Sequence, residues 1–365
     1  MSYSSLGERI SIGVKARVRC SRMLSTDDYW ALLGSDTVRE IAQRLLSTSY
    51  EEALSTLPSD PHRQDIEASV KTSILKEAEE FAIHMSNPRD KFFCTWVRWH
   101  ESENLKSIFR YIAAGRTDRD ELRRRLYVSQ SSKVSYDNVL SARNFSELSE
   151  ALRGSPYYAP LTDALRLAST GDERSLFPLE MALDNFNEAS LFKSLKHLGK
   201  RECAMLLPMF GSRVDLYNIY ILYRAVTFYS LTPEETLNRL LPMRYRVSLA
   251  FLGEAVRAES FERTIELLKA HFPVYADIFA GGLQGDEPQL SLKRNINRYL
   301  YMQAEKLLGT GGPDFHTVMA YFILKEFEIN DIIHITEAVR YGYDRRLAAA
   351  YLIRPIISGG ETEWQ

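Results

Sequence analysis

Apolar residues recur along most of the chain at intervals of three and four residues, the spacing that places them on one side of an α-helix. This pattern predicts short helices over residues 25–33 and 35–46, and long helical segments over 65–85, 176–198 and 291–308. Each long segment is followed by a loop and then by a mostly apolar helix. Because no stretch alternates between apolar and polar residues with period two, little β-structure is expected. The sequence therefore predicts an all-α fold.

A short motif recurs in three of the mostly apolar helices: an acidic residue, a polar residue three positions later, and an apolar residue directly after that. The acidic and polar members are Glu101 and Asn104, Asp215 and Asn218, and Glu328 and Asp331. In the first two instances an arginine, Arg110 or Arg224, follows six positions after the asparagine. The acids lie 114 and 113 residues apart, and a nearly constant period indicates a structural unit present in three copies. We expect three helical repeats, over residues 1–125, 126–240 and 241–365.

A tyrosine marks a second recurring feature, a break between helices. Tyr50, Tyr157 and Tyr275 each follow the end of a predicted helix, and an apolar residue stands four positions after each of them. The break then leads into one of the long helical segments. Each repeat is therefore predicted to be a helical bundle whose long helical hairpin carries the motif.

The motif places a carboxylate among apolar side chains. Glu101 and Asn104 share one helix face with Leu105 and Ile108, and the other two motifs repeat this arrangement. A buried carboxylate is stable only when it is hydrogen-bonded or paired with a cation. Arg110 and Arg224 are candidate partners, across helices or repeats, and we expect the motif to be a structural device that fixes the helix register of each repeat.

The third motif carries more acid than the other two. Asp331 stands where the others have asparagine, and Glu337 stands at the position of their arginine. Basic residues from outside the motif are therefore expected to hold Glu328 and Asp331. The nearest in sequence are Arg340, Arg345 and Arg346.

A catalytic or ion-binding cluster is the alternative interpretation of three equivalent acids. Metal ligands lie about 2–2.6 Å from one ion, whereas repeats more than a hundred residues apart are expected to hold their acids far from one another. Asp331 and His334 have the spacing of half a di-metal site, but matching Glu-x-x-His elements are missing. No phosphate loop or nucleophile elbow is present either. We therefore assign no catalytic, metal-binding or cofactor-binding residue.

Composition narrows the classes of partner. The chain has 365 residues, is 45% apolar and has a formal charge of −2, so no overall positive field favours nucleic acid. Cys20, Cys94 and Cys203 form no metal or redox spacing, and an odd number fits a reducing cytoplasm better than a disulfide framework. The most apolar run, residues 219–231, is interrupted by Arg224, so no direct membrane span is expected.

Three of these features resemble the C/d subunit family of V-type and A/V-type rotary ATPases. They are the threefold internal repeat of helical bundles, the arginine-rich helix from Ala16 to Leu24, and the segment from Glu326 to Ile332 with Gly342 beyond it. The resemblance extends from Ala16 to Gly342. Asp331 and Glu337 depart from the asparagine and arginine that the family usually has there.

This resemblance implies a funnel-shaped all-α molecule with three bundles about a pseudo-threefold axis. Its partners would be the proteolipid rotor ring, on whose cytoplasmic loops one end would sit, and the central-stalk subunits, whose tip the cavity would receive. The chain would then be a non-catalytic coupling subunit that transmits torque for proton or sodium transport. It would be cytoplasmic and peripheral to the membrane through the ring, with no cofactor and no nucleic acid.

Two other functions are compatible with the same helical pattern. One is a generic all-α repeat scaffold, and the other is an all-α metal-dependent enzyme that would use Asp331 and His334. The residues that contact partners are not assigned by any motif in the sequence.

Overall fold

The computed structural model describes residues 3–129, 132–170, 176–229, 231–258, 260–282 and 288–356. These ranges are α-helical with irregular connections and contain no β-strand, which confirms the predicted all-α class. None of their helices combines the length and the apolar character needed to cross a bilayer. The three long segments predicted from the sequence are present as α5 (Arg63–Ala82), α11 (Leu176–Leu195) and α17 (Pro288–Leu308).

The chain divides into two compact units. Unit 1 comprises the described residues of Met1–Glu8 and Leu75–Thr264, and unit 2 those of Arg9–Ile74 and Ile265–Gln365. The predicted repeat boundaries after residues 125 and 240 both fall within unit 1. The division into three repeats remains a prediction.

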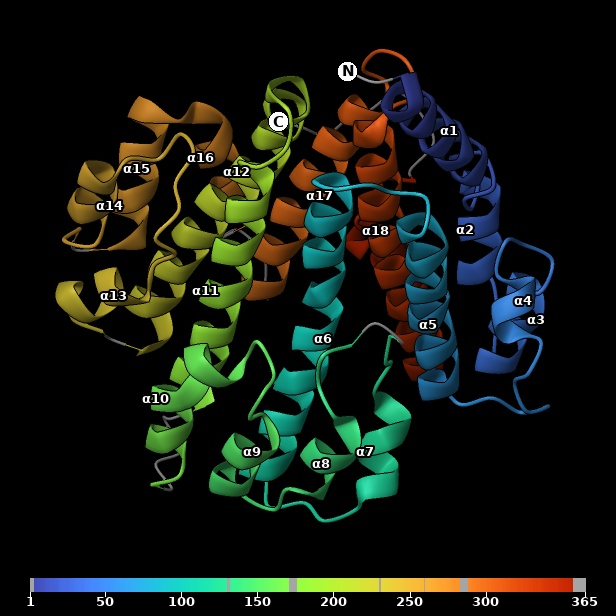
Figure 1. The fold of residues 1–365 in the computed structure, drawn as a ribbon, viewed down its shortest axis with the longest axis horizontal. Helices are drawn as coiled ribbons and strands as arrows, with labels where there is room; N and C mark the ends of the chain where they lie inside the picture. Colours follow the sequence, from blue (N-terminus) through green and yellow to red (C-terminus); the bar gives the residue numbers. More distant parts are fainter. Residues whose placement is uncertain are drawn as a thin grey trace. The chain divides into compact units, whose positions relative to one another are not determined.

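Two long helices, α6 and α11, run side by side in unit 1, and α11 also contacts α10 and α12 (Figure 1). The helices within this unit are α6 (Arg89–Ala113), α7 (Arg119–Arg125), α8 (Tyr136–Ser141), α9 (Phe145–Ala151), α10 (Tyr158–Ala168), α11, α12 (Lys200–Arg224), α13 (Pro233–Arg239) and α14 (Leu249–Ala255). A single π-helical turn, η2 (Ala225–Tyr229), continues α12. Leu105, Phe109, Leu148, Leu161 and Leu183 belong to one buried cluster that joins α6, α9, α10 and α11.

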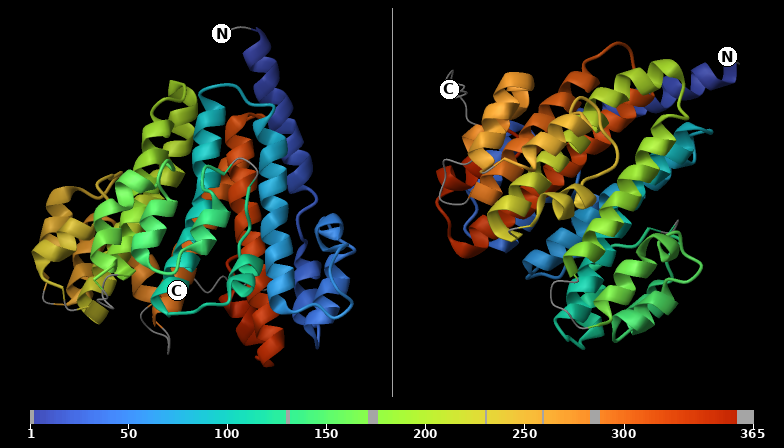
Figure 2. Two further views of the ribbon diagram at one scale, coloured as in Figure 1. Left: turned by 60° about the horizontal axis from the view of Figure 1, so that its bottom comes forward. Right: turned by 90° about the vertical axis from the view of Figure 1, so that its left-hand side faces the viewer.

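Unit 2 is organised around α18. The helices within this unit are α2 (Thr26–Leu33), α3 (Val38–Leu45), α4 (Glu51–Leu54), α16 (Pro273–Gly282), α17, α18 (Phe315–Tyr341) and α19 (Arg345–Tyr351). The orange and red helices α17 and α18 lie side by side (Figure 2), and α2, α3 and α19 also contact α18. Three helices, α1 (Tyr3–Cys20), α5 and α15 (Phe261–His271), have residues in both units.

The sequence of α18 explains its central position. Every residue from Phe315 to Lys325 is buried, so this mostly apolar part of the helix is covered on all sides. Asp314 caps the first turn, where its side chain accepts the N–H of Phe315 at 2.7 Å. The helix ends at Gly342, whose φ of 66° lies in the left-handed region that favours glycine.

One face of α1 is held against the loop before α18 by a close backbone contact. A Cβ atom at Gly13 would lie 2.4 Å from the amide nitrogen of Asp314 and 2.5 Å from the carbonyl carbon of Pro313. Arg9 adds an ion pair with Asp314 at 3.5 Å, and Arg17 donates a hydrogen bond to the Gly311 carbonyl at 2.8 Å. Glycine at position 13 therefore lets two backbones approach as no other residue could.

Replacing Gly13 with alanine should lower the free energy of unfolding by about 1–3 kcal/mol, because the new methyl group would overlap main-chain atoms that cannot move aside easily. A Cβ atom at Gly7, in the same helix, would meet nothing within 4 Å, so Gly7→Ala should instead raise the free energy of unfolding by about 0.5–1 kcal/mol. Urea denaturation of both variants measures the difference. Equal effects of the two substitutions would contradict the close contact.

Candidate functional site

The structure places all six motif side chains in the interior. Glu101 and Asn104 project from α6, Asp215 and Asn218 from α12, and Glu328 and Asp331 from α18; Glu101 has 8% of its surface exposed and the other five have 2% or less. The prediction that the motif lies on buried helix faces is therefore confirmed. The hydrogen-bond partners of these polar groups determine the role of the motif.

The two motif asparagines bind main chain at the same distance along the sequence. Asn104 accepts the N–H of Tyr127 at 3.4 Å and donates to the carbonyl of the same residue at 2.7 Å. Asn218 accepts the N–H of Leu241 at 2.7 Å and donates to its carbonyl at 3.4 Å. Both partners lie 23 residues after the asparagine, in irregular segments. An amide side chain offers an acceptor and a donor group, and here it binds both polar groups of a single residue.

Asp331 binds the corresponding part of the chain with a different set of donors. Its two oxygens accept the N–H groups of Ile353 at 2.7 Å and Arg354 at 3.0 Å, and the Tyr29 hydroxyl donates at 3.4 Å. Ile353 lies 22 residues after Asp331. A carboxylate can only accept, so it binds two successive N–H groups where the asparagines bind an N–H and a carbonyl.

Burial raises the pKa of Asp331 from its ordinary value of 3.8 to about 7, and the three hydrogen bonds and the charge of Arg298 oppose this rise. The same desolvation lowers the pKa of Arg298 to about 10. This carboxyl group therefore takes up a proton in the neutral range even though the protein offers it several donors.

Glu101 and Glu328 each accept a hydrogen bond from one of the predicted break tyrosines. The hydroxyl of Tyr157 donates to Glu101 at 2.8 Å, and that of Tyr50 donates to Glu328 at 2.9 Å. Both tyrosines are buried, and burial followed by the neighbouring carboxylate raises the pKa of each phenol above its ordinary value. The hydroxyl groups are therefore protonated donors at neutral pH.

Further donors complete the two glutamate sites. Ser132 donates to Glu101, while Glu328 accepts the N–H of Leu24 at 2.7 Å and the Lys325 ammonium group at 2.9 Å. Lys325 also lies 3.8 Å from the centre of the Tyr50 ring, within range of a cation–π contact. The charge of Glu328 is thus balanced within its own helix, one turn away.

Asp215 is held by main-chain donors. It accepts the N–H groups of Tyr245, Arg246 and Val247 at 3.0, 2.7 and 3.2 Å. Three successive N–H groups form a concave anion-binding turn of the kind that holds bound phosphates, occupied here by the protein's own carboxylate. The third break tyrosine, Tyr275, is also buried, and its ring lies beside those of Phe272 and Tyr299.

The prediction that Arg110 and Arg224 pair with the motif acids is wrong. Arg110 pairs with Glu180 at 2.8 Å, and Arg224 donates to the Tyr229 hydroxyl at 2.7 Å. Each arginine follows its motif acid by nine residues, and nine residues turn an α-helix by about 900°, which places the two on opposite faces. Each arginine therefore lies on the side of its helix away from the buried motif, where it binds other groups and not a motif acid of its own or of another repeat.

The prediction that Arg340, Arg345 and Arg346 hold the acids of the third motif is also wrong. Arg345 pairs with Asp36 at 3.1 Å, Arg340 lies over the ring of Tyr341, and Arg346 is exposed beyond the end of α18. The cation that holds Glu328 is Lys325, which lies inside the motif stretch itself.

A second buried polar network lies in unit 1 and was not anticipated. Lys106 of α6 pairs with Asp184 of α11 at 2.6 Å, and Tyr217 of α12 donates to the same carboxylate at 2.8 Å. Arg213 of α12 pairs with Glu188 of α11 at 2.6 Å. Burial raises the pKa of Glu188, and the Arg213 charge opposes that rise. The four-residue spacing of Asp184 and Glu188, which places both acids on one face of α11, was the available signal in the sequence.

The residues proposed for a metal-dependent enzyme do not form a metal site. Among the described residues, no three His, Cys, Asp or Glu side chains are placed to hold one ion. Both oxygens of Asp331 accept hydrogen bonds from N–H groups, and the ring of His334 lies 6.2 Å from that of Tyr351. Burial raises the pKa of the Cys20 and Cys94 thiols to about 12, so neither is a thiolate at neutral pH.

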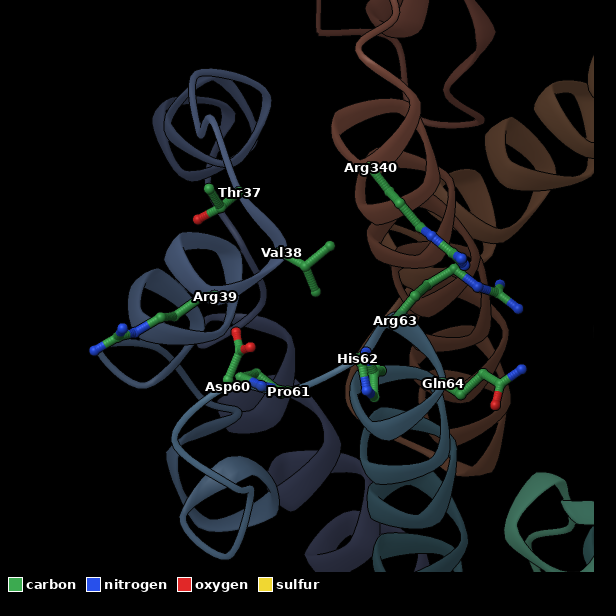
Figure 3. Close-up of a pocket in the computed structure, with 9 residues that line it drawn as sticks. All are labelled: Thr37, Val38, Arg39, Asp60, Pro61, His62, Arg63, Gln64 and Arg340. Atoms are coloured by element: carbon green, nitrogen blue, oxygen red, sulfur yellow. The ribbon is translucent and has the colours of Figure 1, made fainter.

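Unit 2 also has an open hollow of about 580 Å³, which residues of α3, α5 and α18 line (Figure 3). Arg63 and Arg340 extend to the same side of it, while Arg39 points away. Arg63 pairs with Glu67 at 2.9 Å and with Glu337 at 3.0 Å. The charge of Arg63 is therefore balanced by two carboxylates.

Comparison with known proteins agrees with the resemblance seen in the sequence. The profile of a family described as ATP synthase (C/AC39) subunit matches residues 12–351. The chain therefore belongs to the ATP synthase (C/AC39) subunit family. It is similar to the C subunit of the A-type ATP synthase of Methanosphaera stadtmanae, with 22% identity over 335 residues that cover 89% of this chain and 82% of that protein.

Replacing Tyr50 with phenylalanine should lower the free energy of unfolding by about 1–3 kcal/mol, because Glu328 loses a buried hydrogen-bond donor without gaining water. Tyr157→Phe should have a similar effect through Glu101. Chemical denaturation measures both.

Tyr341, with 61% of its surface exposed, supplies the matched control: Tyr341→Phe should leave stability within about 0.5 kcal/mol of the unchanged protein. If all three substitutions were equally mild, the tyrosine hydroxyls would not be stabilising the motif carboxylates.

Asp331 should make stability depend on pH. Because its pKa is higher in the folded than in the unfolded chain, its contribution is fully present below about pH 4 and is lost as the pH rises through about 7. Asp331→Asn should remove this decline, which denaturation at a series of pH values between 4 and 8 would measure.

The exposed Asp163 serves as the control, since Asp163→Asn should leave the pH profile unchanged. An unaltered profile in Asp331→Asn would show that the carboxyl group is ionised throughout this range.

Proposed function

We propose that this chain is a non-catalytic subunit of a rotary ATPase that links the central stalk to the proteolipid rotor ring and transmits torque for proton or sodium transport. The observation that carries the proposal is the family match over residues 12–351, nearly the whole chain. The similarity to the C subunit of an A-type ATP synthase supports membership of such a complex. In this function the chain is cytoplasmic and attaches to the membrane through the ring.

The threefold repeat is part of the proposal, and the motif contacts support it. In all three motifs the polar residue binds main chain 22 or 23 residues later. The acid of the first copy meets the break tyrosine of the second, and the acid of the third meets the break tyrosine of the first. These are two of the three contacts that a cyclic order of repeats would have, as expected for three bundles about a pseudo-threefold axis, as in a funnel.

A spacer that transmits torque must resist twisting, and the buried contacts suit that role. The motif side chains tie each of α6, α12 and α18 to an irregular segment that follows it, and for α18 also to the segment before α2. Polar groups that are fully hydrogen-bonded in the interior hold a single arrangement, because any other arrangement would leave them unsatisfied.

Deletion of the gene in its own organism tests the proposal. Membranes from the deletion strain should lose ATP-driven ion pumping, because torque would no longer reach the ring, while ATP hydrolysis by the remaining complex persists. Pumping is measured by the quenching of a pH-sensitive dye or by sodium uptake, and complementation with the unchanged gene should restore it.

Purification through a tag on this chain gives an independent measurement. The catalytic subunits of a rotary ATPase and its proteolipid should co-purify with the tagged chain. Normal pumping in the deletion strain, together with absence of these subunits from the purified material, would contradict the proposed function.

A further inference from the structure

The outer face of α1 carries an apolar ridge that stays half exposed among the described residues. Ile10, Val14 and Val18 are 46%, 46% and 48% exposed, and they follow one another at four-residue intervals. Side chains at this spacing form one continuous row along a helix. The opposite face, with Ile12, Gly13 and Ala16, is buried, so α1 is held with this ridge outward.

The part of the sequence that carries the ridge is rich in basic residues. From Arg9 to Thr26 the chain contains five basic residues and no acidic one; the basic residues are Arg9, Lys15, Arg17, Arg19 and Arg22. Arg17, next to Val18 in α1, and Arg22, just beyond the end of the helix, are exposed and place positive charge near this end of the ridge. A partner that lies along α1 would have to bring acidic groups to this border.

The shape and composition of the ridge favour a helix over a lipid surface. An i, i+4 row of short branched side chains fits the groove of a second helix. Helices that lie in a membrane surface usually carry Trp, Phe or Leu on their apolar face, whereas the exposed apolar side chains of α1 are those of one isoleucine and two valines. A second copy of this chain would oppose one basic border to another.

We infer that the Ile10–Val14–Val18 ridge of α1 is a docking surface for an α-helix of another protein, one whose apolar stripe is flanked by aspartate and glutamate. The inference rests on the proposed function only in that this helix belongs to another subunit of the same complex. The three apolar residues supply the contact, and the basic border sets its orientation and selects an acidic partner.

Site-specific photo-crosslinking in the intact complex tests this surface. A benzophenone amino acid is placed at position 14 of the tagged chain, and in a parallel sample at Ile83, which is 79% exposed but lies outside the ridge. Irradiation at position 14 should join the chain to a single polypeptide, and mass spectrometry of the linked peptide should identify a helix with acidic residues beside its apolar stripe. Position 83 should not capture that peptide.

A second substitution separates docking from folding. Val18→Asp, at a half-exposed position, should leave the thermal unfolding midpoint unchanged but reduce crosslinking from position 14 about tenfold, because an aspartate would be buried against apolar and acidic groups. Val18→Ser provides a milder version if the aspartate variant folds poorly.

Several results would overturn the inference. Position 14 could capture lipid, a second copy of this chain or a peptide without acidic residues, or it could give no crosslink at all in an intact complex. Undiminished crosslinking in Val18→Asp would also contradict the docking surface. Failure of the proposed function would be seen separately, as absence of rotary ATPase subunits from the purified material. Capture of an acidic helix in that case would still support the docking surface.

Discussion

The buried motif side chains of α6, α12 and α18 are stable because particular groups of the protein donate hydrogen bonds to them. Without those donors, each would cost several kcal/mol of folding free energy. The donors are mostly main-chain N–H groups in irregular segments, so satisfying the helix side chain also sets the path of the segment. Two requirements are thereby met together. Each motif side chain has hydrogen-bond partners in the interior, and the irregular segments that provide them acquire a defined position.

The same position can use an asparagine or an aspartate because the main chain adjusts to it. Asn218 takes one N–H and one carbonyl, whereas Asp331 takes two N–H groups from successive residues. Aspartate in place of asparagine at position 331 therefore changes the hydrogen-bonding pattern, while the side chain stays buried. Its consequence is electrostatic, since a carboxyl group now titrates in the interior where an amide would not.

Helix positions and the burial of the motif could be predicted from the sequence because both follow from the period of the apolar residues. The partners could not. Arg110 stands near Glu101 in sequence but on the opposite face of the helix, and the N–H groups that bind Asp215 have no side-chain signature. The pairing of Lys106 with Asp184 joins residues 78 positions apart on two helices, which periodicity within one helix does not specify.

Unit 2 is built from both ends of the chain, and this has a consequence for biosynthesis. The Leu24 N–H and Tyr50 hydroxyl bind Glu328, so the segment 9–74 lacks these partners until the final part of the chain has been made. At about 5–20 residues per second, the ribosome needs roughly 15–60 s to travel from one part to the other. During that interval the apolar faces of α2 and α3 are without α18. The N-terminal segment must therefore avoid aggregation until α18 has been synthesised, whereas most of unit 1 can fold earlier.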